Sequence, residues 1–181
     1  GTAVVAYCLM ANHVHLVVVP ETVRWLCGAL KPVHLRYAQQ FNRQQGLCGV
    51  LWQGRFYSTP LDERHFWAAV RYVEQNPVCA GLVERAWDYP WSSAAHHCRL
   101  RGDELVSGDL EESDHVGDWK AFLRTEDEEE VRVLRARTRT GRPVPWSTRT
   151  SGSRSSGRWT ACRSASTTAS CPGHGGPRTF G

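Results

Sequence analysis

Two histidines separated by a single valine, His13 and His15, form the pattern in this chain that is best suited to chemistry. They lie in residues 7–19, a stretch rich in valine and leucine that is typical of a β-strand. Because side chains alternate between the two faces of a strand, both imidazoles should project from the same face. Neutral imidazoles held in this way can bind a divalent cation. The alternative is that both histidines are ordinary residues on a partly solvated strand face.

A tyrosine and an asparagine later in the chain could complete such a site. Tyr72 and Asn76 are four residues apart in a predicted helix, so their side chains share one helix face. The carboxamide oxygen of Asn76 is a ligand suited to Mg²⁺ or Mn²⁺. The hydroxyl of Tyr72, with an ordinary pKa of ~10, is a weak nucleophile unless a nearby cation favours its phenolate. The same cation would polarise a phosphate oxygen, so these residue types together predict phosphoryl-transfer chemistry.

The histidine pair is predicted to lie in strand-forming residues 3–19, with a break near residues 11–12. Apolar residues then recur at helical spacing over residues 22–42, where Pro32 should kink the helix or split it. The glycine-containing segment that follows is predicted to be a loop. Its Trp52 and neighbouring side chains should either contact nucleic acid or pack on the core.

The helix that carries Tyr72 should begin at Asp62, whose side chain can accept a hydrogen bond from the first turn. It should end near Asn76, because Pro77 disfavours helical geometry in the residue before it. A short helix reaching His97 should follow, capped by one of the two preceding serines, Ser92 or Ser93.

The composition is that of one folded domain followed by a tail. The 181 residues carry a net charge of +4 and contain no apolar run long enough to span a membrane. Residues 103–131 are acidic, with short amphipathic pieces around 119–123 and 131–134, and should form a solvated surface appendage. Residues 144–181 lack large aliphatic side chains almost entirely and should be disordered. The abrupt change in composition there also suggests translation in a wrong reading frame. Seven scattered cysteines without a Cys-x-x-Cys pair favour reduced thiols in a cytoplasm.

Five motifs in a fixed order carry a family resemblance: residues 9–16 (LMANHVHL), 36–42 (RYAQQFN), 49–56 (GVLWQGRF), 71–78 (RYVEQNPV) and 89–93 (YPWSS). Together they resemble the REP-associated tyrosine transposases, a bacterial branch of the single-tyrosine HUH transposases. The resemblance implies an α/β (α+β) fold with a ferredoxin-like antiparallel sheet and helices packed on it. It divides the chain into a catalytic core at 1–98, an acidic and basic extension with short helices at 99–143, and the tail at 144–181.

The resemblance also implies roles for the residues that match the motifs. His13 and His15 correspond to the metal-binding pair, Asn76 to the third ligand and Tyr72 to the nucleophile. Such enzymes cleave and rejoin single-stranded DNA beside a hairpin, through a 5′-phosphotyrosine and a free 3′-hydroxyl, with Mg²⁺ or Mn²⁺. The resemblance implies a cytoplasmic bacterial protein that acts as a monomer or homodimer. Side-chain chemistry alone adds five candidates for DNA contact: Arg36, Arg43, Trp52, Arg55 and Arg71.

Several alternatives remain open. Tyr37 lies on the apolar stripe of its helix and should be a core residue, and no metal ligand lies at helical spacing from Tyr57. Members of the family usually have another strand and helix before the histidine strand, so these elements are expected to be missing here, which leaves an exposed sheet edge. An inactive remnant or a DNA-binding fragment is therefore a second hypothesis. A histidine-triad nucleotide phosphoesterase would need a third histidine where this chain has Val17.

Overall fold

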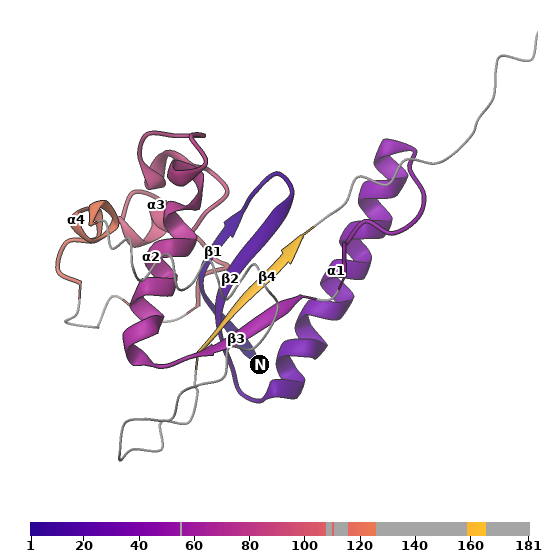
Figure 1. Ribbon diagram of the computed structural model, residues 1–181, viewed down its shortest axis with the longest axis horizontal. Helices are drawn as coiled ribbons and strands as arrows, with labels where there is room; N and C mark the ends of the chain where they lie inside the picture. Colours follow the sequence, from indigo (N-terminus) through magenta and orange to yellow (C-terminus); the bar gives the residue numbers. More distant parts are fainter. Residues whose placement is uncertain (55, 108–109, 111–115, 126–158, 166–181) are drawn as a thin grey trace, which may run out of the picture.

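The fold is built on a four-stranded antiparallel sheet with helices on its faces (Figure 1). The computed structural model describes residues 1–54, 56–107, 110 and 116–125, and the backbone of residues 159–165. The strands lie in the order β1 (Thr2–Leu9), β2 (His13–Pro20), β4 (Trp159–Ala165) and β3 (Tyr57–Leu61). The predicted mixed α/β class with an antiparallel sheet is confirmed.

Strands β1 and β2 form the hairpin that carries the histidine pair. The backbone N–H of Met10 donates to the carbonyl of His13 at 2.9 Å, which closes the turn where the sequence predicts a break. Cys8 is paired with His15 and Leu9 with Val14 across the hairpin. This register fixes the position of the histidines relative to β1, because a slip of one residue would move every side chain to the other face.

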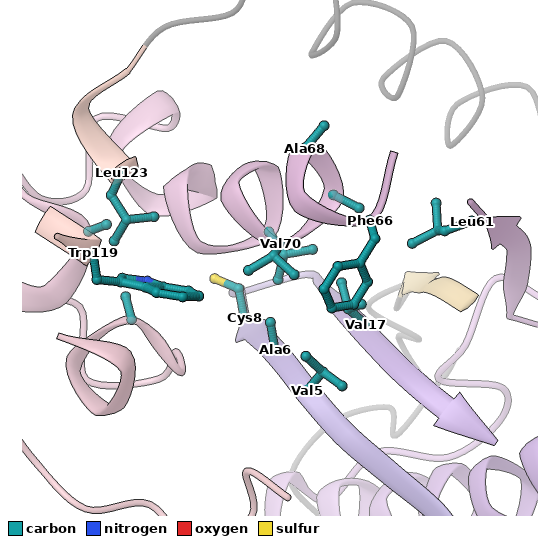
Figure 2. Close-up of a cluster of buried hydrophobic side chains, with 14 residues drawn as sticks. Val5, Ala6, Cys8, Val17, Leu61, Phe66, Ala68, Val70, Trp119 and Leu123 are labelled. Carbon is teal, nitrogen blue, oxygen red and sulfur yellow. The ribbon is translucent and has the colours of Figure 1, made fainter. Parts of the chain in front are cut away.

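Two long helices cover opposite faces of this hairpin, as Figure 1 shows. Helix α1 (Val23–Gln45) packs Leu26 against Val18, on the face of β2 opposite the histidines. Helix α2 (Glu63–Cys79) packs on the face that carries Val17 and therefore His13 and His15. Figure 2 shows the cluster beneath α2, where side chains from the helix and from both strands interlock. The alternation of side chains thus gives each helix its own face of the hairpin.

Both prolines predicted to end or interrupt a helix lie inside one. Helix α1 is continuous through Pro32, so the predicted split is wrong. Pro32 is exposed, and the carbonyl of Gly28 that loses its helical partner there can be hydrated. Helix α2 also continues beyond Pro77 to Cys79, and the predicted end at Asn76 is wrong. Only one helical hydrogen bond is lost so near the end, and the Ala80 N–H still donates to the Asn76 carbonyl at 3.0 Å.

The acidic region contributes to the core rather than forming only a surface appendage. Helix α4 (Trp119–Arg124) begins at Asp118, whose carboxylate accepts hydrogen bonds from Lys120 N and Ala121 N. Its Trp119 and Leu123 are buried in the cluster under α2, at the end away from Phe66 (Figure 2). The prediction for residues 103–131 is therefore wrong for α4, because two apolar side chains one turn apart outweigh the polar composition around them.

Two short helical elements lie between α2 and α4 in the sequence. The helix caps predicted from the sequence agree with the structure only in part. They are the 3₁₀ helix η1 (Ala86–Asp88) and helix α3 (Ala94–His97). Asp62 caps α2 as predicted, accepting from His65 N at 2.9 Å. Ser93 occupies the N-cap position of α3 but makes no capping hydrogen bond with its side chain, which binds other groups instead.

Strands β3 and β4 depart from the sequence-based prediction. Disorder is predicted for residues 144–181, but Trp159–Ala165 pairs with both β2 and β3, so the prediction is wrong for this stretch. A strand between two others satisfies its backbone groups on both sides, a gain that side-chain composition does not report. The rest of residues 144–181 lies outside the described residues. Strand β3 falls in the predicted loop, and its Pro60 is accommodated because β3 is an edge strand.

The state of the cysteines tests the prediction of reduced thiols. Among the cysteines whose side chains are described, Cys8, Cys27, Cys79 and Cys98 are free, whereas Cys48 is in a disulfide. The prediction of reduced thiols is therefore wrong for Cys48, since spacing along the chain does not report which cysteines meet in space.

Among the helices in the described part of the chain, none combines the length and apolar character needed to cross a bilayer.

Candidate functional site

The two histidines of β2 lie side by side at the hairpin end of the strand. Their ring centroids are 4.8 Å apart with the ring planes nearly perpendicular. His15 is buried, with 2% of its surface exposed, whereas His13 is half-buried. The predicted projection of both imidazoles from one strand face is confirmed, and the pair has one ring in the core and one nearer solvent.

Tyr72 of α2 lies against this pair. Its ring centroid is 5.5 Å from that of His15, in an edge-to-face arrangement. The contact arises because α2 packs its apolar stripe, including Val70 and Val73, on the histidine face of the hairpin. Two residues that are 57 positions apart in the sequence, His15 and Tyr72, are thereby brought into ring contact. The sequence predicted their proximity only on the assumption that both belong to one site.

Asn76 lies one turn after Tyr72 on the same helix. Its Nδ2 donates to the carbonyl of Tyr72 at 2.8 Å, so the amide nitrogen is engaged by the helix backbone. This hydrogen bond orients the carboxamide and leaves its oxygen as the group that could accept a cation. Among the described residues, no group of three His, Cys, Asp or Glu side chains is arranged to hold a metal ion. A site built on the two histidines would therefore need an oxygen of another type, such as that of Asn76.

The donor set fits a divalent cation in one further respect. Asn12 Oδ1 lies 2.6 Å from His13 Nδ1, so that nitrogen carries the proton if the two share a hydrogen bond. The lone pair of the neutral ring is then on Nε2. Metal-binding histidines commonly have one nitrogen fixed by an outer hydrogen bond in this manner. Asn12 was not predicted as a site residue, although it adjoins the histidine pair in the sequence.

A buried polar cluster on the other side of α2 was also missed by the sequence analysis. Glu74 is fully buried, and its two carboxylate oxygens are surrounded by three donors from two other segments, α3 with its N-cap residue and α4. Oε1 lies 2.5 Å from Ser93 Oγ and 2.6 Å from His97 Nδ1, and Oε2 accepts from Trp119 Nε1 at 2.9 Å. The sequence signal was a glutamate on the predicted apolar stripe, four residues after Val70.

The candidate DNA contacts fall into two groups. Arg36 and Arg43 are exposed on α1, as expected of residues that bind phosphates. Arg71 is 8% exposed, and its guanidinium lies 5.3 Å from the centroid of the Phe122 ring. A surface contact from Arg71 does not agree with this position, because its helix turns that side chain toward α4. Arg55 lies outside the described residues.

Trp52 packs against α1, so the alternative of core packing describes it best. Its Nε1 donates to the carbonyl of His34 at 3.0 Å, and the two rings stack at 4.4 Å. Burial lowers the pKa of His34, which favours its neutral form. Tyr37 and Phe41 extend this aromatic row along the helix, with centroids 5.7 Å from Trp52 to Tyr37 and 6.0 Å from Tyr37 to Phe41.

Two further tyrosines that were weighed against Tyr72, namely Tyr37 and Tyr57, have different surroundings. Tyr37 is 52% exposed, so the prediction of a core position is wrong; the loop carrying Trp52 leaves one side of its ring open. Tyr57 is 55% exposed on the edge strand β3. Of these three tyrosines, it is Tyr72 whose ring contacts a histidine of the pair.

Comparisons with known proteins add no evidence on the function of this chain. No family model, curated protein or solved structure matches this chain. The case for a function therefore rests on the geometry of β2 and α2 and on the motifs in the sequence.

Proposed function

We propose that this chain is a metal-dependent transposase or endonuclease of the single-tyrosine HUH type, which cleaves and rejoins single-stranded DNA through Tyr72. The observation that carries the proposal is the contact of Tyr72 with His15, whose ring in turn lies against His13. A tyrosine of α2 and two imidazoles of β2 thus lie in contact, which supports the proposal. The family, its ferredoxin-like fold and its bacterial setting are parts of this proposal.

His13, His15 and Asn76 would hold Mg²⁺ or Mn²⁺. A cation bound there supplies positive charge that polarises a phosphate oxygen and favours the phenolate of Tyr72. Tyr72 Oη then attacks the phosphorus of a phosphodiester, forming a bond to the 5′-phosphate as the bond to the 3′-oxygen breaks. The leaving oxygen takes up a proton and becomes a free 3′-hydroxyl. Because the phosphotyrosine conserves the ester, a 3′-hydroxyl can reverse the step without ATP.

Helix α1 would bind the sugar–phosphate backbone of the substrate. It carries four basic residues and no acidic one, and Arg36 and Arg43 are exposed. An unopposed positive helix attracts a polyanion irrespective of its sequence, which suits a positioning role. We place Trp52 beside this surface as support for the helix, since one face of its ring is already stacked on His34.

The decisive experiment uses a hairpin oligonucleotide with a single-stranded extension and a fluorophore at its 3′ end. With Mn²⁺, cleavage should transfer the 3′-labelled fragment to the protein, visible as a labelled band on a denaturing gel. A 5′-labelled copy should instead release a short free fragment. Tyr72→Phe should abolish the protein-linked label, and Tyr37→Phe, at an exposed tyrosine outside the histidine site, should retain it.

The outcomes separate the two functional hypotheses. Label that survives Tyr72→Phe would exclude Tyr72 as the nucleophile. Binding of the oligonucleotide without any covalent label, in Mg²⁺ or Mn²⁺, would favour an inactive remnant that only binds DNA. Loss of label on chelation, with recovery after Mn²⁺ is restored, would support the metal requirement.

A further inference from the structure

We propose that Glu74 is a positioning residue, which fixes α2 on the hairpin so that the ring of Tyr72 lies against His15. Its effect on DNA cleavage rests on the proposed function, whereas its effect on the geometry does not. Glu74 is not itself at the histidine pair: it is two residues from Tyr72, and two residues correspond to about 200° around a helix. Its side chain therefore leaves α2 on a different side from the tyrosine ring.

The three contacts of Glu74 connect α2 to two other segments. Ser93 and His97 come from the start and end of the turn that forms α3, and Trp119 comes from α4. Both carboxylate oxygens are used, and every atom involved lies in the buried core. The indole of Trp119 also packs on the His97 ring, with centroids 4.4 Å apart, so two of the three donors support one another.

Ser93 extends this connection to the strands. Its Oγ accepts a hydrogen bond from the backbone N–H of Tyr7 at 3.0 Å, and its own N–H donates to the Tyr7 carbonyl at 3.1 Å. Tyr7 belongs to β1 and is paired with Leu16, the neighbour of His15 on β2. A short path of hydrogen bonds and strand pairing thus leads from Glu74 through Ser93 and Tyr7 to the strand that carries the histidines.

The energetics make this path a sensitive determinant of helix position. Apolar packing tolerates small rotations or shifts of a helix, because it is not directional. A buried carboxylate with three donors does not, since a donor that loses its acceptor in the core keeps its desolvation cost without a compensating hydrogen bond. Polar groups of this kind can select one arrangement among several that pack equally well. Here the selected arrangement is the one that places Tyr72 on His15.

A direct test measures the position of the Tyr72 ring through the NMR signals of His15. An aromatic ring 5.5 Å away, edge-to-face, shifts the carbon-bound ring protons of His15, and Tyr72→Leu defines the spectrum without that ring. Glu74→Ala should move the His15 signals toward those of Tyr72→Leu. Ser93→Ala, which keeps the carboxylate but removes its link to Tyr7, should move them in the same direction by a smaller amount.

Two further variants separate positioning from general loss of stability. Glu74→Gln should keep the His15 signals close to those of wild type, because its oxygen can accept from Trp119 Nε1. Its nitrogen can donate to Ser93 Oγ once that hydroxyl rotates, and to His97 Nδ1 once the ring carries its proton on Nε2. Leu123→Ala removes a buried side chain of the same core cluster without touching these hydrogen bonds, so it should lower the melting temperature and leave the signals in place. Unchanged signals in both Glu74→Ala and Ser93→Ala would overturn the proposal. If Glu74→Ala does not fold, Ser93→Ala decides.

Single-turnover kinetics then test the catalytic consequence. If the labelling assay is positive, Glu74→Ala should slow formation of the covalent adduct at least tenfold while changing the dissociation constant for DNA less than threefold. Glu74→Gln should restore most of the rate, and Leu123→Ala should match wild type well below its melting temperature. Displaced His15 signals with an unchanged rate would refute the catalytic part alone. Absence of label in the wild type would refute the proposed function and leave the NMR result to decide positioning.

Discussion

Helices α1 and α2 lie on opposite faces of the same hairpin but relate to it in different ways (Figure 1). Among the described side chains of α1, only Leu26 is buried, and the helix exposes large apolar side chains such as Trp25 and Val33. Helix α2 buries most of one side and adds the hydrogen-bonded carboxylate of Glu74. The first arrangement suits a surface that binds a partner by charge. The second suits a scaffold that must hold a reacting group in one position.

The largest expected difference between the two helices is in the reactivity of a cysteine beneath α2 and a cysteine on α1. Cys8 is fully buried under α2, and burial, together with the nearby charge of Glu74, raises its pKa to about 12. At pH 8 the thiolate fraction is then only ~10⁻⁴, and the reagent also has no access. Cys27 is free and exposed on α1. Iodoacetamide should alkylate Cys27 at least ~10³-fold faster than Cys8 in the folded protein.

Peptide mapping by mass spectrometry after timed alkylation measures both rates in one sample. In urea, where the fold is lost, the two cysteines should react at comparable rates. Similar rates in the native protein would mean that the core under α2 opens readily, and the contrast between the helices would disappear.

Core truncation should separate the two helices next. Phe66 of α2 is 3% exposed, so Phe66→Ala should lower the free energy of unfolding by about 3–5 kcal/mol, the usual cost of a large cavity. Phe41 of α1 is only half-buried and contacts the exposed ring of Tyr37, so Phe41→Ala should cost about 1 kcal/mol. Urea unfolding followed by circular dichroism gives both values. Equal losses would show that α1 is packed as firmly as α2.

Alkaline pH should destabilise the β1 side of the molecule through Tyr7. Burial, and then its hydrogen bond to Asp103 at 2.5 Å, raises the pKa of Tyr7 to about 12. The folded state therefore favours the neutral phenol, and this contribution is complete below pH 10 and lost as the pH rises toward 12. Stability should fall by up to about 1.4 kcal/mol per pH unit in this window. Tyr7→Phe should flatten that part of the curve; an unchanged slope would assign the effect to other groups.

The sequence predicted the parts of the fold and site that depend on local patterns. The alternation around His13 and His15 placed both rings on one face, and the four-residue spacing placed Tyr72 and Asn76 together on a helix. The N-cap at Asp62 was also correct. In each case the residues that set the geometry lie within a few positions of one another, so periodicity and capping preferences are sufficient.

The features that failed depend on contacts between distant segments. Nothing near Trp119 in the sequence indicates that its indole reaches Glu74, 45 residues away. Helices α1 and α2 continue through Pro32 and Pro77, which local propensity does not predict. Strand β4 forms by pairing with both β2 and β3, which composition does not report. Tertiary context therefore decided the polar cluster, the helix lengths and strands β3 and β4, while local rules decided the histidine strand.

Substituting the arginines of α1 should have the smallest effect on stability. The same substitutions should clearly weaken binding of a fluorescent single-stranded oligonucleotide. Arg36→Gln and Arg43→Gln change exposed side chains, so the free energy of unfolding should stay within about 0.5 kcal/mol of wild type. If each arginine neutralises one phosphate, the slope of log Kd against log salt concentration should fall by ~0.7 for each substitution. Arg124→Gln on α4 is the matched control, since that exposed arginine lies over Trp87 away from α1. Fluorescence anisotropy over a salt series measures the slopes. An equal decrease with Arg124→Gln would show that binding follows net charge alone, and α1 would then lose its assigned role as the binding side of the comparison.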